Sequence, residues 1–186
     1  MILPIVGYGH PTLKKKAKPI TPDYPELEEL LENMFETMYN ALGVGLAAPQ
    51  VNLPIRIFVV DGSELEGDGE DMTGFKKVFI NPEKIEETGP EWTFEEGCLS
   101  IPDIRENVRR PGDIRLRYFD ENFHEITEEF GGMKARIIQH EYDHLEGVLF
   151  TDHISQLRRS MLKGRLSKIS KGDISVDYPM KFPHKK

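Results

Sequence analysis

The stretch GMKARIIQHEYDHLEG, residues 132–147, decides how the chain folds and where its chemistry lies. Glycines mark both ends, and the apolar residues between them indicate a buried helix. On that helix His140 and His144 lie four residues apart, so both imidazoles project from one face. Glu141 lies about 100° further round, where it can accept a proton from water held by an ion. A chance HExxH on a solvated helix is the alternative, but burying these polar groups without a partner is costly, which favours a metal site.

A catalytic metal site usually has three protein ligands and one open position, so a third ligand is needed. Phe150 stands where the HExxHxxGxxH pattern would place another histidine, and no glutamate follows Glu146. Asp152 and His153, just past the helix end, remain candidates. Cys98, the single cysteine, is the strongest candidate, because a thiolate binds Zn or Fe(II) well and the preceding glycine allows close backbone approach.

The rest of the sequence predicts an α+β fold. Residues 25–42 place apolar side chains at helical spacing and predict an amphipathic helix. Strands are expected at residues 55–60 and 78–82 and within residues 92–130, and a last amphipathic helix is expected over residues 153–170. Helix, then strands, then helices is typical of mostly antiparallel sheets, here packed around the central HExxH helix.

The length of 186 residues suits one domain. We expect residues 1–170 to form a single catalytic domain and residues 171–186 to be a loose basic tail. Residues 61–74, DGSELEGDGEDMTG, are acidic and rich in glycine, which predicts a solvated surface loop. Residues 43–52, GVGLAAPQVN, are small and apolar and predict a tightly packed loop.

Charge is distributed unevenly along the chain. The net charge of −8 combines +7 over residues 154–186 with −15 over residues 1–153. The basic side chains of the last predicted helix form either a solvated face or a surface that docks on ribosomal RNA or protein: Arg158, Arg159, Lys163, Arg165 and Lys168. The chain has no secretory signal and no transmembrane run, so we expect a cytoplasmic protein with no membrane or DNA partner.

Three motifs together resemble the signature of the peptide deformylases. They are GVGLAAPQ at residues 43–50, EGCLS at residues 96–100 and HEYDH at residues 140–144, complete and in the family's order. The similarity extends over about residues 1–170. Peptide deformylases remove the formyl group from N-formylmethionine at the start of new bacterial chains and release formate. The resemblance therefore implies a metal-dependent hydrolase that acts on N-formylmethionyl nascent peptides.

The resemblance also implies roles around the metal. Cys98, His140 and His144 would bind one divalent ion, natively Fe(II) in many members, with Zn, Ni or Co able to substitute. Glu141 would be the general base and then the acid that protonates the leaving amine. Glu96 either accepts a hydrogen bond from a ligand imidazole or is an ordinary surface carboxylate.

Further roles concern the substrate. By resemblance, the side-chain amide of Gln50 and the backbone N–H of Leu99 would donate hydrogen bonds to the developing oxyanion. Gly43 and Gly45 would let an extended peptide lie alongside their loop, and Ile137 would line the methionine pocket. Next to Ile137 the chain has an arginine where the family often has an apolar residue.

Two other functions compete with this interpretation. HExxH alone would also suit a metalloendopeptidase, although the usual downstream ligand is missing. A structural metal module or peptide-binding module would predict that Glu141→Ala leaves every activity unchanged, whereas the enzyme hypothesis predicts near-complete loss of turnover. We expect the enzyme to be a monomer.

Overall fold

The computed structural model describes residues 1–65 and 69–183. Residues 66–68 of the predicted acidic loop and residues 184–186 of the predicted tail lie outside the described residues. The described residues form three α-helices: α1 (Leu27–Asn40), α2 (Gly132–Leu145) and α3 (Gln156–Lys171). No helix in the described part of the chain is both long and apolar enough to cross a membrane.

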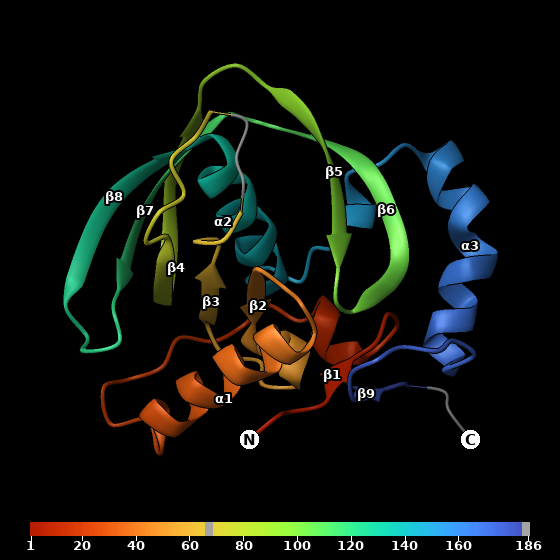
Figure 1. The fold of residues 1–186 in the computed structure, drawn as a ribbon, viewed down its shortest axis with the longest axis horizontal. Helices are drawn as coiled ribbons and strands as arrows, with labels where there is room; N and C mark the ends of the chain where they lie inside the picture. The colour runs from red at the N-terminus through yellow and green to blue at the C-terminus, as the bar shows by residue number, and fades with distance from the viewer. Residues whose placement is uncertain (66–68, 184–186) are drawn as a thin grey trace.

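The strands form one large antiparallel sheet and two small pairs. The large sheet has the order β2-β3-β4-β7-β8, with β2 (Gly45–Ala47), β3 (Ile57–Asp61), β4 (Lys76–Thr88), β7 (Asp113–Phe119) and β8 (Glu125–Gly131). A separate antiparallel ribbon pairs β5 (Trp92–Cys98) with β6 (Ile101–Arg110), and β1 (Ile5–Val6) pairs with β9 (Met180–Lys181) in parallel. Helix α2 lies between the large sheet and the ribbon (Figure 1). The predicted α+β fold around a central HExxH helix is confirmed.

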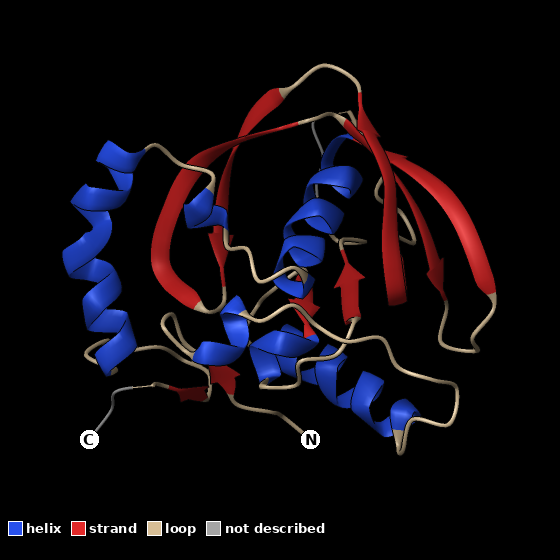
Figure 2. Cartoon of the chain, turned by 180° about the vertical axis from the view of Figure 1, so that it is seen from behind, coloured by secondary structure: helices blue, strands red, loops and turns tan. Residues whose placement is uncertain are grey.

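Strand β3 explains why the layers stack in this order. Successive side chains of a strand point to opposite faces. Phe58 and Val60 therefore pack in the cluster that contains α2, whereas Ile57 and Val59 pack in the cluster that contains α1. All four are fully buried, so β3 is covered on both faces. Seen from behind, α3 lies against the outside of the β5–β6 ribbon (Figure 2).

Two helices differ by a few residues from their predicted bounds, and one segment that was predicted to be a loop contains secondary structure. The helix expected over residues 25–42 runs over Leu27–Asn40, and the one expected over residues 153–170 runs over Gln156–Lys171. Ser155 sets the later start of α3, because its side chain accepts a hydrogen bond from the backbone N–H of Arg158. Residues 43–52 contain β2 and a short 3-10 helix, η2 (Ala48–Val51), rather than a loop.

The acidic segment before β4 is largely exposed among its described residues, as predicted for a surface loop, but it is anchored at its β4 end. Met72 and Phe75 are each only 3% exposed. The Glu70 carboxylate accepts a hydrogen bond from the backbone N–H of Met133 at 2.7 Å, in the first turn of α2. The first N–H groups of a helix lack partners within the helix, and its N-terminus carries a partial positive charge. The N-cap residue of α2, Gly131, has no side chain to pair with these groups, so the Glu70 carboxylate accepts the hydrogen bond and offsets the charge.

Residues 173–183 of the end of the chain, which was expected to be a loose tail, pack against the chain around β1, and we call them the C-terminal strap. Gly172, with φ at 70°, ends α3 and turns the chain back toward β1. In β9 the pairing is closed by Ile5 N–H to Pro179 O at 2.9 Å and Gly7 N–H to Lys181 O at 2.8 Å. Every second strap side chain is half-buried: Ile174, Val176, Tyr178, Met180 and Phe182. This alternation is visible in the sequence and is the signal that the prediction overlooked.

Candidate active site

Three potential metal ligands come together from two elements. Cys98 ends β5, and His140 and His144 lie one turn apart on α2. Their donor atoms all lie within 4.8 Å of one another, and Cys98 Sγ is 3.4 Å from His144 Nε2. Burial lowers the pKa of His144 to about 3, so its imidazole is neutral and can offer a lone pair. A thiolate with two imidazoles fits one divalent metal ion.

The other two candidates for a third ligand are occupied elsewhere. Asp152 pairs with Lys14 at 2.6 Å and accepts a hydrogen bond from the backbone N–H of Leu149. His153 Nε2 lies 2.7 Å from a carboxylate oxygen of Asp143. Neither belongs to the metal-ligating cluster found among the described residues. The expectation that Cys98 completes the set with the two histidines is therefore supported.

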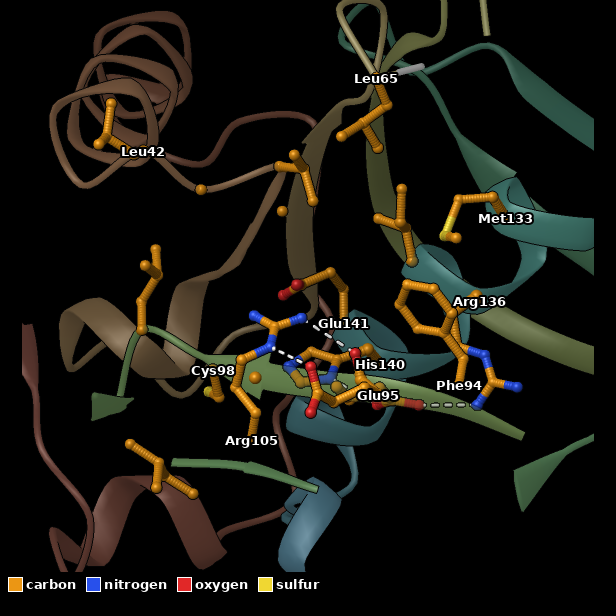
Figure 3. Close-up of a pocket in the computed structure, with 18 of the residues that line it drawn as sticks. Leu42, Leu65, Phe94, Glu95, Cys98, Arg105, Met133, Arg136, His140 and Glu141 are labelled. Atoms are coloured by element: carbon orange, nitrogen blue, oxygen red, sulfur yellow. Dashed lines mark hydrogen bonds and ion pairs between the residues drawn. The ribbon is translucent and has the colours of Figure 1, made fainter. Parts of the chain in front are cut away.

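The β5–β6 ribbon delivers Cys98 to the helix. Its pairing register shifts between Glu96 and Cys98, and such an irregularity re-aims the side chains beside it. Gly97 lies within this shift, where an added Cβ would come 2.9 Å from Nη1 of Arg105. The absence of a side chain at residue 97 therefore leaves room for the Arg105 guanidinium, which contacts Glu95 (Figure 3).

Glu96 is a buried carboxylate, not a surface one, and it contacts one metal-ligand candidate and two arginines. It is 5% exposed, and its Oε1 lies 2.9 Å from Nδ1 of His140. Arg110 donates to both of its oxygens, at 2.7 Å and 2.9 Å, and Arg136 donates at 2.8 Å. Burial alone would raise the pKa of Glu96, but the hydrogen bonds with His140 and Arg110 outweigh it and hold the pKa well below 4.5. Glu96 is thus an anion that orients the His140 ring with Nδ1 toward Glu96, so that Nε2 is the nitrogen that can bind a metal.

The pKa of His140 also depends on its hydrogen-bond partners. Burial would lower its pKa, but hydrogen bonds with Cys98 and Glu96 raise it well above 6.5. An ion bound by His140 and Cys98 would replace the proton that these groups share, so we expect binding to release protons.

Arg136 directs its charge away from the groove. Its guanidinium lies over the Trp92 ring at 4.4 Å and donates to the backbone carbonyls of Trp92 and Val108, besides Glu96. Figure 3 shows the side chain pointing away from Glu141. The arginine beside Ile137 is one of the residues that line the groove, but its guanidinium is engaged by Glu96, the Trp92 ring and two backbone carbonyls. Sequence reasoning missed the tasks of Arg110 and Arg136, because their partners are distant along the chain.

Gln50 presents its amide to the ligands. Its Oε1 accepts a hydrogen bond from the backbone N–H of Ala47 at 2.9 Å, which fixes the orientation of the amide. Its Nε2 lies 3.5 Å from Cys98 Sγ and donates to Ser100 Oγ at 3.2 Å. The side chain is 1% exposed. Gln50 therefore places an N–H donor beside the metal-ligating cluster.

Glu141 is a buried carboxyl at the floor of the groove. It is 5% exposed, and its Oε2 is among the buried polar atoms that have no hydrogen-bond partner in the described part of the chain. Burial raises its pKa to about 7, so it can gain or lose a proton near neutral pH. It lies against the backbone of Gly45, where an added Cβ would come 2.8 Å from its Cδ.

A groove of about 1200 Å³ contains these groups. It is lined by Gly43, Gly45 and Ile137, and also by Cys98, His140 and Glu141. In Figure 3, Leu65, Met133 and Phe94 lie on one side of Glu141 and Cys98 lies on the other. The groove thus combines an apolar region with a cluster of reactive groups, the usual composition of a ligand pocket.

Comparison with known proteins gives a consistent answer. The family model for polypeptide deformylases matches residues 2–160. The chain is 56% identical to the peptide deformylase of Christiangramia forsetii, over all of this chain and 98% of the relative. It is also 56% identical to that of Cytophaga hutchinsonii, over the full length of both. The crystal structure of a peptide deformylase from Legionella pneumophila has a TM-score of 0.79 and 36% identity, covering 93% of this chain and 98% of that one.

The chain belongs to the peptide deformylase family. The predictions of family, of a metal-binding hydrolase and of peptide deformylase activity are confirmed. The endopeptidase and binding-module alternatives are set aside, because the match extends over nearly the whole chain. The expected formylated peptide substrate is the one that the peptide deformylase family implies.

Proposed function

We propose that Cys98, His140 and His144 hold one divalent ion, beside which Glu141 moves the proton that deformylation requires. The observation that carries this assignment is the position of Glu141, a buried carboxyl with a pKa raised to about 7 that follows a ligand on α2 and lines the groove. A group that must first take a proton and then return it works best when its pKa is near the working pH.

The ion would be Fe(II) in the cell, with Zn, Ni or Co able to substitute, since all of these accept thiolate and imidazole ligands. When bound, such an ion lowers the pKa of a water molecule toward ~7 and polarises the formyl carbonyl. Purification without oxygen followed by metal analysis tests the assignment. One equivalent of iron supports it, and stoichiometric zinc with no iron contradicts it.

The chain's own groups would carry the proton and hold the developing charge. Glu141 accepts a proton from the attacking water and delivers it to the nitrogen of the leaving methionine. The Nε2 of Gln50 and the backbone N–H of Leu99 donate to the oxygen that becomes negative, and each such donor is typically worth about 3–4 kcal/mol in the transition state. Because Ala47 already orients the Gln50 amide, little reorganisation is needed when the charge develops.

The substrate would lie as an extended strand. Gly43 and Gly45 line the groove along β2, which is an edge strand with which a peptide backbone could pair, as in peptides that add to a strand edge. The methionine side chain would occupy the apolar region near Ile137, Leu65 and Met133. The formyl carbon would then lie between Gln50 and the ligand cluster.

Formate release from formyl-Met-Ala-Ser, compared with cleavage of an internal-bond peptide reporter, tests the function. We expect formate release with no cleavage of the reporter. The Glu141→Ala variant should retain one equivalent of metal and lose nearly all turnover. Reporter cleavage without formate release, or full activity of Glu141→Ala, would contradict the proposal.

We also propose that α3 contacts the ribosome, where formylated chains emerge. Two of its six cations are held by the ribbon, since Arg158 pairs with Glu106 and Arg165 donates to the carbonyl of Asp103. Of the other exposed cations, Arg159 donates to the carbonyl of Asp152 at 3.4 Å, whereas Lys163 and Lys168 are available to a phosphate-rich partner.

Co-sedimentation with ribosomes at low salt tests this contact. Substituting Lys163 and Lys168 together by Glu should reduce pelleting and leave hydrolysis of a short formylated peptide unchanged. Unchanged pelleting would contradict the contact. We further propose a cytoplasmic monomer, for which light scattering in solution gives the mass.

A further inference from the structure

The C-terminal strap runs past the active-site groove. Four consecutive residues of it, Ser175–Tyr178, line the groove together with Cys98 and Leu99. The strap lies beyond residue 160, where the match to the family model ends. It therefore supplies a wall of the groove from outside the matched part of the chain.

The strap is held firmly at both ends. Gly172 turns the chain at the end of α3, and β9 closes two backbone hydrogen bonds with the chain around β1. Phe182 packs in the cluster formed by β6 and α3, and an added Cβ at Gly7 would come 2.9 Å from its ring. Tyr178 lies between these anchors and packs in the cluster that contains α1 and β3. Its position is thus determined by packing on both sides.

Tyr178 makes a specific contact with the turn that follows the cysteine ligand. Its hydroxyl donates a hydrogen bond to the backbone carbonyl of Leu99 at 2.7 Å. Burial raises the pKa of Tyr178 further above its ordinary value of 10, so the hydroxyl keeps its proton throughout the working pH range. The same turn is held on its other side, where Tyr8 N–H donates to Ser100 O at 2.9 Å.

The hydrogen bond from Tyr178 restricts the backbone conformation of Leu99. Peptide groups are planar, so the N–H and the C=O on either side of a Cα are related only through φ and ψ of that residue. Fixing the carbonyl of Leu99 restricts its ψ, and so restricts how the turn can move relative to Cys98. Across the groove the Leu99 side chain faces Gly43, where an added Cβ would come 2.8 Å from Leu99 Cδ1. Leu99 is thus held between the strap and the β2 side of the groove.

We propose that Tyr178 is a positioning residue for deformylation, which holds the Cys98–Leu99 turn so that the Leu99 N–H points at the developing oxyanion. This role rests on the oxyanion assignment made above. The hydroxyl does not contact the reacting atoms. It acts through Leu99, and the strap is therefore part of the catalytic apparatus.

The test is Tyr178→Phe, which removes the hydroxyl and keeps the ring. A neutral hydrogen bond of this kind is worth a factor of about 3–10 in an equilibrium. We expect kcat toward formyl-Met-Ala-Ser to fall by about that factor with KM changed less than twofold, the pattern of an interaction made only in the transition state. Tyr24→Phe is the matched control, because Tyr24 packs half-buried in the same cluster but does not line the groove. The control should behave as the wild type does.

Hydrogen exchange supplies a measurement that does not depend on activity. In Tyr178→Phe, exchange should become faster in the peptide that covers residues 97–101 and stay unchanged in β1 and β9. A kcat within twofold of the wild type overturns the proposal. Faster exchange throughout the strap, or a loss carried by KM, also overturns it, because either result means that the strap has detached or that it binds substrate directly. If the wild-type protein releases no formate at all, the proposed function is contradicted. The hydrogen-exchange comparison would still show whether Tyr178 holds the Cys98–Leu99 turn.

Discussion

Removing the carboxylate of Glu96 should destabilise the protein more than any other single change near the metal ligands. Glu96→Ala leaves two almost fully buried guanidinium groups without their shared anion, since Arg110 is 4% exposed and Arg136 is 2% exposed. Breaking a buried ion pair from one side typically lowers the free energy of unfolding by about 3–5 kcal/mol, because the remaining charge stays buried.

The structure places the expected loss at the lower end of that range. Arg110 keeps its contact with Asp143 at 2.8 Å, and Arg136 keeps the carbonyls of Trp92 and Val108. We therefore expect a loss of about 3 kcal/mol, which for a chain of this size corresponds to a decrease in Tm of about 6–12 °C. Because His140 also loses its orienting partner, metal affinity should fall by about 10–100-fold.

Urea unfolding of the metal-free protein at pH 7 measures the first effect, and competition with a chelator measures the second. The control is Glu95→Ala on the same strand, where the side chain is 61% exposed and pairs with an exposed Arg105. That exposed pair should contribute less than about 1 kcal/mol. A loss below about 1 kcal/mol for Glu96→Ala, equal to that of Glu95→Ala, would refute the reasoning.

The pH dependence of this effect has a definite sign. The pKa of Glu96 is lower in the folded state than its ordinary value of 4.5, so its stabilising contribution is fully present above about pH 4.5. The contribution is lost as the pH falls through the folded-state pKa. The difference between wild type and Glu96→Ala should therefore shrink as the pH falls below about 4.5.

Three other changes test separate parts of the structure. Gly45→Ala should reduce kcat by at least about tenfold with metal retained, because a Cβ there would come 2.8 Å from Cδ of Glu141 and displace the carboxyl; unchanged kcat would contradict this placement of Glu141. In the metal-free protein, a folded-state pKa of about 7 for Glu141 makes wild-type stability fall as the pH rises from about 4.5 to 7. Glu141→Gln should therefore be more stable than the wild type above pH 7, by up to about 3 kcal/mol, and lose this advantage below about pH 4.5. A stability difference between the two proteins that is the same at pH 4 and pH 8 in urea unfolding would contradict this prediction. Glu70→Ala should lower the free energy of unfolding by about 1 kcal/mol and speed hydrogen exchange at Met133, because α2 loses its cap; unchanged exchange there would show that Glu70 does not cap the helix.

Local patterns in the sequence were enough to predict the main elements and the metal ligands. Spacing of four residues on a helix necessarily brings His140 and His144 to one face, wherever the helix lies in the fold. The missing downstream ligand and the three motifs then indicated Cys98 and Gln50. Periodicity predicted the three helices to within three residues at each end, because helix repeats and caps are local properties.

Contacts between distant parts of the chain were decided only by tertiary structure. The salt bridges of Glu96 with Arg110 and Arg136 join residues 14 and 40 positions apart, and the hydrogen bond from Tyr178 to Leu99 joins residues 79 apart. The periodicity of the sequence does not predict such pairs, because each depends on how the sheet, the ribbon and the helix pack against one another. The sequence by itself thus indicated which residues form the candidate metal site, because one helix repeat and short motifs carry that information. The packing of α2 between sheet and ribbon decided what surrounds those residues: the buried anion behind His140, the cap on α2 and the strap beside Leu99.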